Sequence, residues 1–337
     1  MSKGITYGIG LGILTLLLFA SNLFWGALSI PFADVFHILC GEETAKTSWQ
    51  FIIWDNRLPQ ALTATLCGAA LAVSGLLLQT AFRNPLAGPS ILGIDSGANL
   101  GVAIVMLGLG GVVSTSSFSL GGFALVIIAA MVGAMSVMGL LLFFSSLLKN
   151  DIMLLITGIM LGYITSSAIS LLQYTATESG MYSFMVWGLG SFSSTTWERM
   201  PAFVATILIG LACAAALIKP LNALLLGTNY ARNLGIPIRR TRTMLLWTTG
   251  LLTASCTAFC GPIAFIGLAV PHLARLLLGT TNHRSLLPAT MLMGASLALL
   301  CNLISTLPGD AGLIPINVIT PILGAPVIIY VILKQRW

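Results

Sequence analysis

Long uncharged stretches alternate with short polar joints along the chain. Runs without Asp, Glu, Lys or Arg cover residues 4–33, 58–82, 96–148, 152–177, 243–274, 285–309 and 311–333. A charge at the centre of a bilayer costs about 2.5–3.5 kcal/mol even on a lenient insertion scale, so the charged joints mark the ends of membrane spans. One helical crossing of a hydrocarbon core of about 30 Å takes about 20 apolar residues. The pattern therefore predicts an all-α, multi-pass membrane protein.

Two of these runs are long enough for two spans each, and we place their turns in the Gly- and Ser-rich residues 108–122 and at Gly261-Pro262. The ten predicted spans then cover residues 5–26, 60–81, 91–109, 122–146, 153–175, 202–218, 243–260, 263–278, 286–306 and 316–333. The first run is about twice as long as a signal-peptide core and lacks an A-x-A cleavage site, so we expect a retained helix. We expect a single transmembrane domain over residues 1–337.

Composition agrees with this fold class. Of the residues, 57% are hydrophobic and only 7% are charged, whereas about 25% are charged in ordinary soluble domains. So few charges cannot cover the surface of a soluble globule, which excludes that class.

The charges divide between the two faces of the membrane. If the N-terminus is cytoplasmic, Lys46, Arg57 and Arg199 fall on outer joints, which leaves twelve of the 15 basic residues inside. This positive-inside bias predicts that both termini are cytoplasmic. The acids show the opposite bias, and only Asp95 and Asp151 are expected near the inner face. The net charge of +6 is thus an average over two unlike faces, so a nucleic-acid partner is not expected.

The predicted spans carry little ionisable chemistry. No Asp or Glu falls at a predicted midplane, and snorkelling explains His272 and Arg275 in the inner half of the eighth span. An ion-coupled carrier is therefore disfavoured, although backbone carbonyls can also hold Na⁺, so this class stays open. The sequence contains no G-x-x-x-x-G-K-[ST], H-E-x-x-H or G-x-S-x-G motif, so we expect no ATPase or other catalytic site. The six cysteines form no C-x-x-C pair, and packing is favoured over metal binding even for Cys256 and Cys260.

Proline and glycine interrupt several spans. The breaks include residues 84–89 (NPLAGP), Gly261-Pro262, Pro271, Pro315 and Pro321. Proline removes a backbone donor, so it is tolerated at membrane depth where protein or a water-filled cavity satisfies the freed groups. Several breaks in one chain indicate a transport pathway; the alternative is that each is a structural kink.

Two groups of motifs lie in the N-terminal and the C-terminal part of the chain. The first comprises Arg57-Leu58-Pro59, residues 68–75 (GAALAVSG), Gln79, residues 84–87 (NPLA), residues 92–94 (LGI) and Gly97-Ala98. The second comprises residues 261–275 (GPIAFIGLAVPHLAR), His283-Arg284, Leu287-Pro288 and the segment from Leu313-Ile314-Pro315 to Gly324-Ala325-Pro326. These segments resemble the signatures of the FecCD-type permeases, the membrane subunits of ABC importers for ferric siderophores, haem and cobalamin.

The resemblance implies the inverted-repeat fold of a type II ABC importer in the bacterial inner membrane. Two copies would form a homodimer around a central path, with two ATP-binding subunits on the cytoplasmic side and a periplasmic or surface substrate-binding protein outside. ATP and Mg²⁺ would bind to the partner ATPase, so no cofactor is expected in this chain. Spans 2–5 and 7–10 would be inverted halves, of which the sequence shows only a faint echo between residues 68–94 and 250–276.

The resemblance also implies roles for particular residues. The ATPase-coupling loop falls in residues 221–240, where the candidates are Gly227, Thr228, Tyr230, Ala231, Arg232, Leu234 and Gly235. This is the longest polar cytoplasmic joint, and its arginines offer charge to a soluble partner. The family usually has an acidic residue at the position of Thr228. The alternative is a loop that is merely positive-inside.

Three further sites follow from the same resemblance. Arg57 matches a position that receives an acidic residue of the binding protein, Gln60 stands where a second arginine is common, and Arg199 is a possible substitute; alternatively, Arg57 only caps the outer end of the second span. Asn150 and Asp151 correspond to the inner gate. The candidates for the translocation path are Tyr174, Glu178, Met181, Tyr182, Met185 and Trp187, and packing against lipid or helices is the alternative for each.

Together these expectations describe a permease that passes an intact iron chelate, a siderophore or haem, into the cytoplasm, driven by ATP hydrolysis in another subunit. Cobalamin is the alternative cargo within the family. The alternative of a different class is an ion-coupled secondary transporter or channel.

Overall fold

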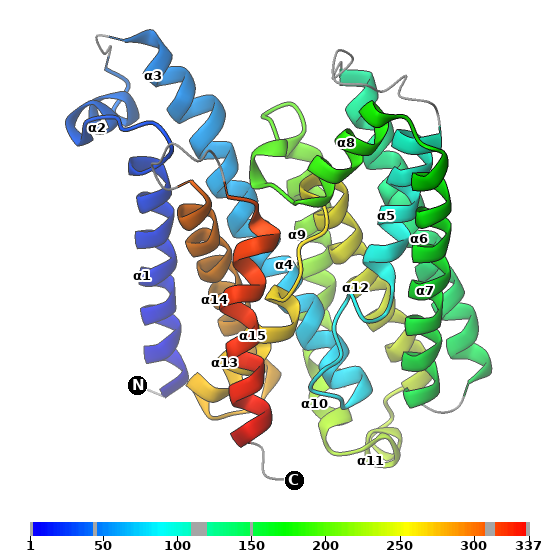
Figure 1. Cartoon of the computed structure of the whole chain (residues 1–337). Helices are drawn as coiled ribbons and strands as arrows, with labels where there is room; N and C mark the ends of the chain where they lie inside the picture. The colour runs from blue at the N-terminus through cyan, green and yellow to red at the C-terminus, as the bar shows by residue number, and fades with distance from the viewer. Residues whose placement is uncertain (1–2, 43–45, 109–119, 149–150, 307–313, 335–337) are drawn as a thin grey trace.

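The computed structural model describes residues 3–42, 46–108, 120–148, 151–306 and 314–334, which form helices joined by short turns, with no strand among them (Figure 1). In chain order the elements are α1 (Lys3–Phe24), α2 (Phe32–Leu39), α3 (Thr47–Phe51), the π-helical η1 (Ile52–Arg57), α4 (Leu58–Phe82), α5 (Ile94–Ala103), the π-helical η2 (Ile104–Gly108), α6 (Leu120–Leu147), α7 (Asp151–Thr175), α8 (Glu178–Gly188), the 3₁₀ turn η4 (Phe192–Ser194), α9 (Met200–Ala216), α10 (Ile218–Leu225), α11 (Thr228–Asn233), α12 (Ile238–Cys260), α13 (Ile266–Leu278), α14 (His283–Ser305) and α15 (Ile316–Lys334).

Each of the ten predicted spans coincides with a helix. Among the described residues, six helices are long and apolar enough to cross a membrane, and α9 with α10 makes a seventh span if this pair, bent by 48°, is counted together. Shorter apolar helices at residues 94–108, 266–278 and 316–331 match the other three predicted spans. The predicted fold class, an all-α multi-pass membrane protein, is confirmed.

The structure adds short helices where the sequence predicted only joints. These are α2, α3, α8, α10 and α11, of which α3 has 5 residues and α8 has 11. They are too short to give a hydrophobic signal over a membrane-spanning window. The helix of the second span also begins earlier than predicted, because α3, η1 and α4 run on without a break from Thr47 to Phe82.

Two helices, α5 and α13, begin after non-helical breaks inside the protein. The break before α5 covers residues 83–93 and contains positive φ angles at Arg83 (46°) and Gly93 (74°). The break before α13 covers residues 261–265 and contains positive φ angles at Gly261 (75°) and Phe265 (68°). Side chains with a Cβ are strained in this region, so surrounding contacts must hold Arg83 and Phe265 in place. The expected breaks at residues 84–89 and at Gly261-Pro262 are therefore real interruptions, whereas Pro271 and Pro321 lie inside α13 and α15.

Helix α4 runs through the middle of the subunit (Figure 1). Within its apolar span 83% of the residues are buried, against 17% for α1 and for α7. Glycine allows its neighbours to approach closely: a Cβ added to Gly75 would lie 1.6 Å from the Gly267 carbonyl oxygen of α13, and one added to Gly68 would lie 2.3 Å from the Gly294 carbonyl oxygen of α14. Small residues at such crossings are the usual means of helix packing in lipid.

Both ends of the chain lie at the end of the molecule that carries α10 and α11 (Figure 1). An even number of crossings requires this arrangement. The opposite end carries α2, α3 and α8, and we refer to it as the outer end.

Candidate translocation and docking sites

The predicted coupling loop is a compact helical turn that projects from the subunit. Gly227 enters α11 with φ +115° and Gly235 leaves it with φ +79°, conformations that favour glycine. Between them the Ala231 N–H donates to the Gly227 carbonyl oxygen (2.8 Å), and Ala231 itself is buried. The Arg83 side chain donates from Nη2 to the Leu224 carbonyl oxygen (3.0 Å), which joins the end of α10 to the end of α4.

The exposed side of this turn is suited to a protein contact. Tyr230, Arg232, Leu234 and Gly235 are exposed, whereas Ala231 is the residue that anchors the turn. Large apolar side chains exposed beside a charge at the end of a membrane protein indicate a docking surface. All seven predicted coupling residues therefore lie on one structural unit.

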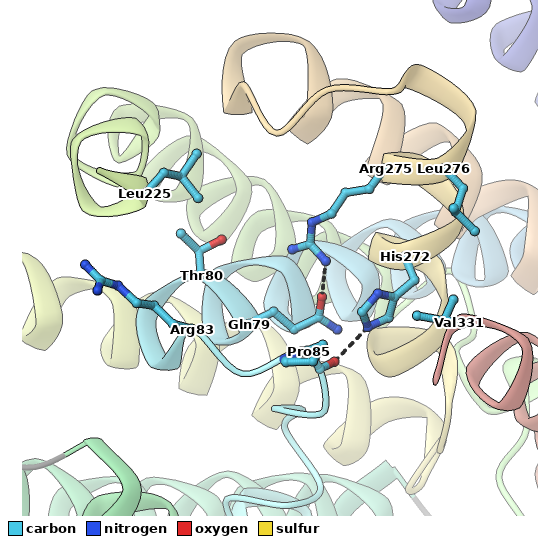
Figure 2. A pocket seen from close by; sticks show the side chains of 9 residues that line it. All are labelled: Gln79, Thr80, Arg83, Pro85, Leu225, His272, Arg275, Leu276 and Val331. Carbon is cyan, nitrogen blue, oxygen red and sulfur yellow. Dashed lines mark hydrogen bonds between the residues drawn. The ribbon is translucent and has the colours of Figure 1, made fainter. Parts of the chain in front are cut away.

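A cavity of about 620 Å³ opens near the same end, between α4, α10, α13 and α15 (Figure 2). Its lining residues are Gln79, Thr80, Arg83, Pro85, Leu225, His272, Arg275, Leu276 and Val331. Arg83 and Pro85 belong to the break before α5, and the other residues belong to the four helices. This is where the first and second motif groups meet in space.

Two hydrogen bonds fix the polar side of this cavity (Figure 2). The Arg275 Nη1 donates to the Gln79 Oε1 (2.6 Å), and the His272 Nε2 donates to the Pro85 carbonyl oxygen (2.7 Å). The Gln79 Nε2 in turn donates to the Leu268 carbonyl oxygen (3.1 Å). His272 and Arg275 therefore do not need snorkelling to explain them; they bind α13 to the end of α4 and to the segment that follows it.

The three predicted outer docking residues have different environments. Arg57 is buried and donates to the carbonyl oxygens of Leu23 (2.8 Å), Phe24 (3.0 Å) and Leu28 (2.5 Å). It thus caps the outer end of α1, the first span, and not the second span as in the alternative stated above. Gln60 is also buried and donates to the Asn302 Oδ1 (2.9 Å).

Arg57 and Gln60 nevertheless line one small outer pocket of about 260 Å³, so the structure brings this predicted pair together. Arg199 lies apart from that pocket, at the start of α9, where it donates to the Ser194 carbonyl oxygen (3.2 Å).

The predicted path residues lie at the outer end of α7 and along α8. Tyr174 is 88% exposed, and Tyr182, Met185 and Glu178 are exposed as well. Met181 is half-buried, as is Trp187, whose ring stacks on Phe184 at 6.3 Å between centroids. Most of this set is thus on the surface of the isolated subunit. Of the predicted inner gate, Asn150 lies outside the described residues, and Asp151 begins α7 with its side chain outside the described part.

Asn317 is a polar residue that the sequence analysis did not single out. It donates from Nδ2 to the carbonyl oxygens of Gly188 (3.0 Å) and Pro262 (2.6 Å), and its Oδ1 accepts from the Ala264 N–H (3.3 Å). One amide therefore ties α15 to α8 and to the break before α13. Asn317 stands two residues after Pro315, and no local sequence pattern indicates that its amide joins these segments.

Asp95 is placed differently from the prediction that it lies near the inner face. Its Oδ1 accepts a hydrogen bond from the Thr257 hydroxyl of α12 (2.9 Å). Thr257 stands 15 residues beyond Arg242 on α12, about 22 Å along the helix at 1.5 Å per residue, so Asp95 lies deep in the membrane. The prediction was wrong because the segment 83–93 re-enters the protein before α5 begins.

Re-entrant breaks, half-length helices and a cavity lined by the first break and by α13 are features of a multi-pass transport protein. The FecCD transport family matches residues 13–334, and the chain belongs to this family. Under this classification it is the permease subunit of an ABC importer and a multi-pass inner-membrane protein.

Individual relatives agree with this family. The chain is 39% identical over 296 residues to the vitamin B12 import system permease protein BtuC of Klebsiella pneumoniae subsp. pneumoniae, covering 87% of this chain and 86% of the relative. It is 37% identical over 318 residues to BtuC of Salmonella paratyphi A, covering 92% and 94%. A solved chain described as a metal-chelate type ABC transporter in an inward-facing conformation superposes with a TM-score of 0.83 at 33% identity, over 97% of this chain and 99% of that chain.

Proposed function

We propose that the chain carries a vitamin B12-type metal chelate into the cytoplasm, using ATP hydrolysed by a separate subunit. The assignment of the cargo rests on the similarity to BtuC proteins along 92% of this chain. Cobalamin therefore replaces the iron chelate as the first candidate. An iron siderophore or haem is the second candidate, supported by the likeness to a transporter described only as metal-chelate type.

The path would form between two copies of the chain. Helices α7 and α15 both expose large apolar side chains, and they border the face from which the segment between α4 and α5 is visible (Figure 1). A second copy over this face would cover those side chains and enclose the candidate path residues of α8. The homodimer predicted from the resemblance fits this surface.

The partners would bind at opposite ends. We assign the α11 end to the cytoplasm because most basic residues lie on the joints at that end. The ATP-binding subunits would dock on α11, and a substrate-binding protein would dock at the outer end near Arg199 and the pocket of Arg57. The break before α5 would move with α10, which leads into α11, through the Arg83 bond, so that nucleotide-driven motion reaches the cavity at Arg275.

Reconstitution tests the proposal. The chain, its ATP-binding subunit and its binding protein are placed in proteoliposomes, and uptake of radiolabelled cyanocobalamin is compared with uptake of a ferric siderophore and of haem. We expect cobalamin uptake that requires ATP on the side of the ATP-binding subunits. Uptake of only the iron compounds would select the second candidate, and uptake by the permease alone under an ion gradient would select a secondary carrier.

A further inference from the structure

Besides the cavity of Figure 2 and the outer pocket, a groove of about 730 Å³ lies on the flank of the subunit at the α11 end. It is formed by the last turns of α6, by α11 and by the first turns of α12. Its lining residues are Leu142, Ser145, Ser146, Thr228, Arg232, Ile238, Arg239, Arg242, Thr243 and Trp247. The cavity of Figure 2 shares none of these residues, so the two sites are separate.

The lining changes from charged to apolar along the groove. Arg232, Arg239 and Arg242 supply three guanidinium groups at one end. Trp247 lies one to two turns further along α12 from Arg242, beside Leu142 of α6, and it is half-exposed. Along the groove, cationic side chains are followed by hydroxyl groups, then by tryptophan and an aliphatic side chain. Polarity changes in the same order from the headgroups to the hydrocarbon of a membrane.

The apolar end continues onto surface that faces lipid. Phe143 on α6 and Met244 on α12 expose their side chains next to the groove. An acidic protein surface would match the arginines but would leave Trp247 and this apolar surface without a partner. A lipid with an anionic headgroup matches both parts of the groove at once.

We propose that this groove binds the headgroup of an anionic phospholipid, with the phosphate at Arg239 and Arg242 and an acyl chain along Trp247 and Leu142. The site joins α11 to α6, the helix that leads to the predicted inner gate, so a bound lipid would stiffen the link between ATPase docking and gating. This inference rests on the proposed function in one respect: the groove faces the cytoplasmic leaflet because the α11 end is assigned to the cytoplasm there.

Bromine-labelled lipids test the proposal without any transport measurement. The permease, in complex with its ATP-binding subunits, is reconstituted in nanodiscs that contain dibrominated phosphatidylglycerol or dibrominated phosphatidylcholine, and tryptophan fluorescence is recorded. Comparison with Trp247→Phe isolates the signal of Trp247. We expect preferential quenching of Trp247 by the anionic lipid and about a fivefold loss of relative affinity for each arginine replaced, the ratio that corresponds to about 1 kcal/mol.

Matched variants separate the site from general charge. Arg239→Gln with Arg242→Gln should remove the preference, Arg239→Lys with Arg242→Lys should keep most of it, and Arg240→Gln should keep all of it, because Arg240 is exposed but lies outside the groove. Equal quenching by the two lipids, or a preference that survives loss of both arginines, would overturn the proposal. Quenching seen only without the ATP-binding subunits would also overturn it, in favour of a protein contact. Failure of cobalamin uptake would leave these results unaffected.

Discussion

Arg232 is the residue whose exposed charge can report most directly on the proposed coupling. It stands on α11 beside Tyr230 and is held in place by the buried Ala231. Arg232→Glu should leave the subunit folded, because the side chain is on the surface, but it should repel an acidic partner and lower ATP-dependent uptake at least about tenfold. The measurement is uptake and ATP hydrolysis in proteoliposomes.

Arg284→Glu serves as the control for Arg232, because Arg284 is exposed at the same end, at the start of α14. It should keep near-normal uptake. Normal uptake by Arg232→Glu would remove the coupling role from this residue.

The hydrogen bond between Thr257 and Asp95 is a second residue-scale test. Thr257→Val removes the donor from a partly buried carboxylate and should lower the free energy of unfolding by about 1 kcal/mol, within the range measured for bonds between membrane helices. Asp95→Asn keeps an acceptor oxygen and should cost less. Thr157→Val is the control, since the Thr157 hydroxyl bonds the Met153 carbonyl oxygen of its own helix. Thermal stability in detergent measures all three, and equal effects at both threonines would contradict the assigned role.

Residues were predictable where their chemistry could be read from the local sequence. The predicted coupling residues around Arg232 share one turn that two glycines bound, and both glycines are visible in the sequence. Arg57 and Gln60 have partners on α1 and α14, far along the chain, so their burial depends on packing that the local sequence does not contain. Asp95 was misplaced for the same reason, since its depth depends on where a break ends.

At the scale of elements, the close crossing of α4 and α13 is the sharpest packing constraint. Gly75→Ala would bring a Cβ to 1.6 Å from the Gly267 backbone, which cannot move without separating the helices. We expect a loss of at least about 3 kcal/mol, the upper end for overpacked cores, with little folded protein recovered. Fluorescence-detected size exclusion after heating measures the folded fraction.

Gly139→Ala is the matched control for Gly75. A Cβ at Gly139 of α6 meets nothing within 4 Å, so alanine should be neutral or stabilise the helix by up to about 1 kcal/mol. Equal recovery of both variants would show that α4 and α13 are not held at this distance.

The order and number of long helices could be predicted because each needs about 20 uncharged residues, a property of the local sequence. The breaks were also visible, through Pro85 and Pro262. The first residues of α5 and α13 were not, since both helices begin three residues later than predicted. The breaks before them are held by hydrogen bonds such as those of Asn317 and His272, which join segments far apart in sequence. Short helices such as α8 and α11 were not predicted, because packing, rather than hydrophobic length, stabilises them.

For the whole molecule, the sparse burial of α7 leaves a surface that must face either lipid or a second copy. Ile164 on α7 and Ile322 on α15 are each 65% exposed. They lie at similar depth, about 20 Å and 18 Å from the helix ends at the α11 end of the molecule, at 1.5 Å per residue. If two copies enclose the path, α7 of one copy can meet α15 of the other at this level.

Cysteines at these two positions turn the homodimer into a measurable cross-link. In a background with the exposed Cys40 and Cys213 changed to serine, Ile164→Cys with Ile322→Cys should form a covalent dimer on oxidation. Leu16→Cys with Ile322→Cys is the control, because Leu16 on α1 is 70% exposed and also about 20 Å from the same end. A dimer band from the control pair alone would place the second copy against α1, so that α7 faces lipid and the path cannot form between α7 and α15. A band from the α7 pair alone is expected, since the face beside the two breaks is the one that a transport pathway must enclose.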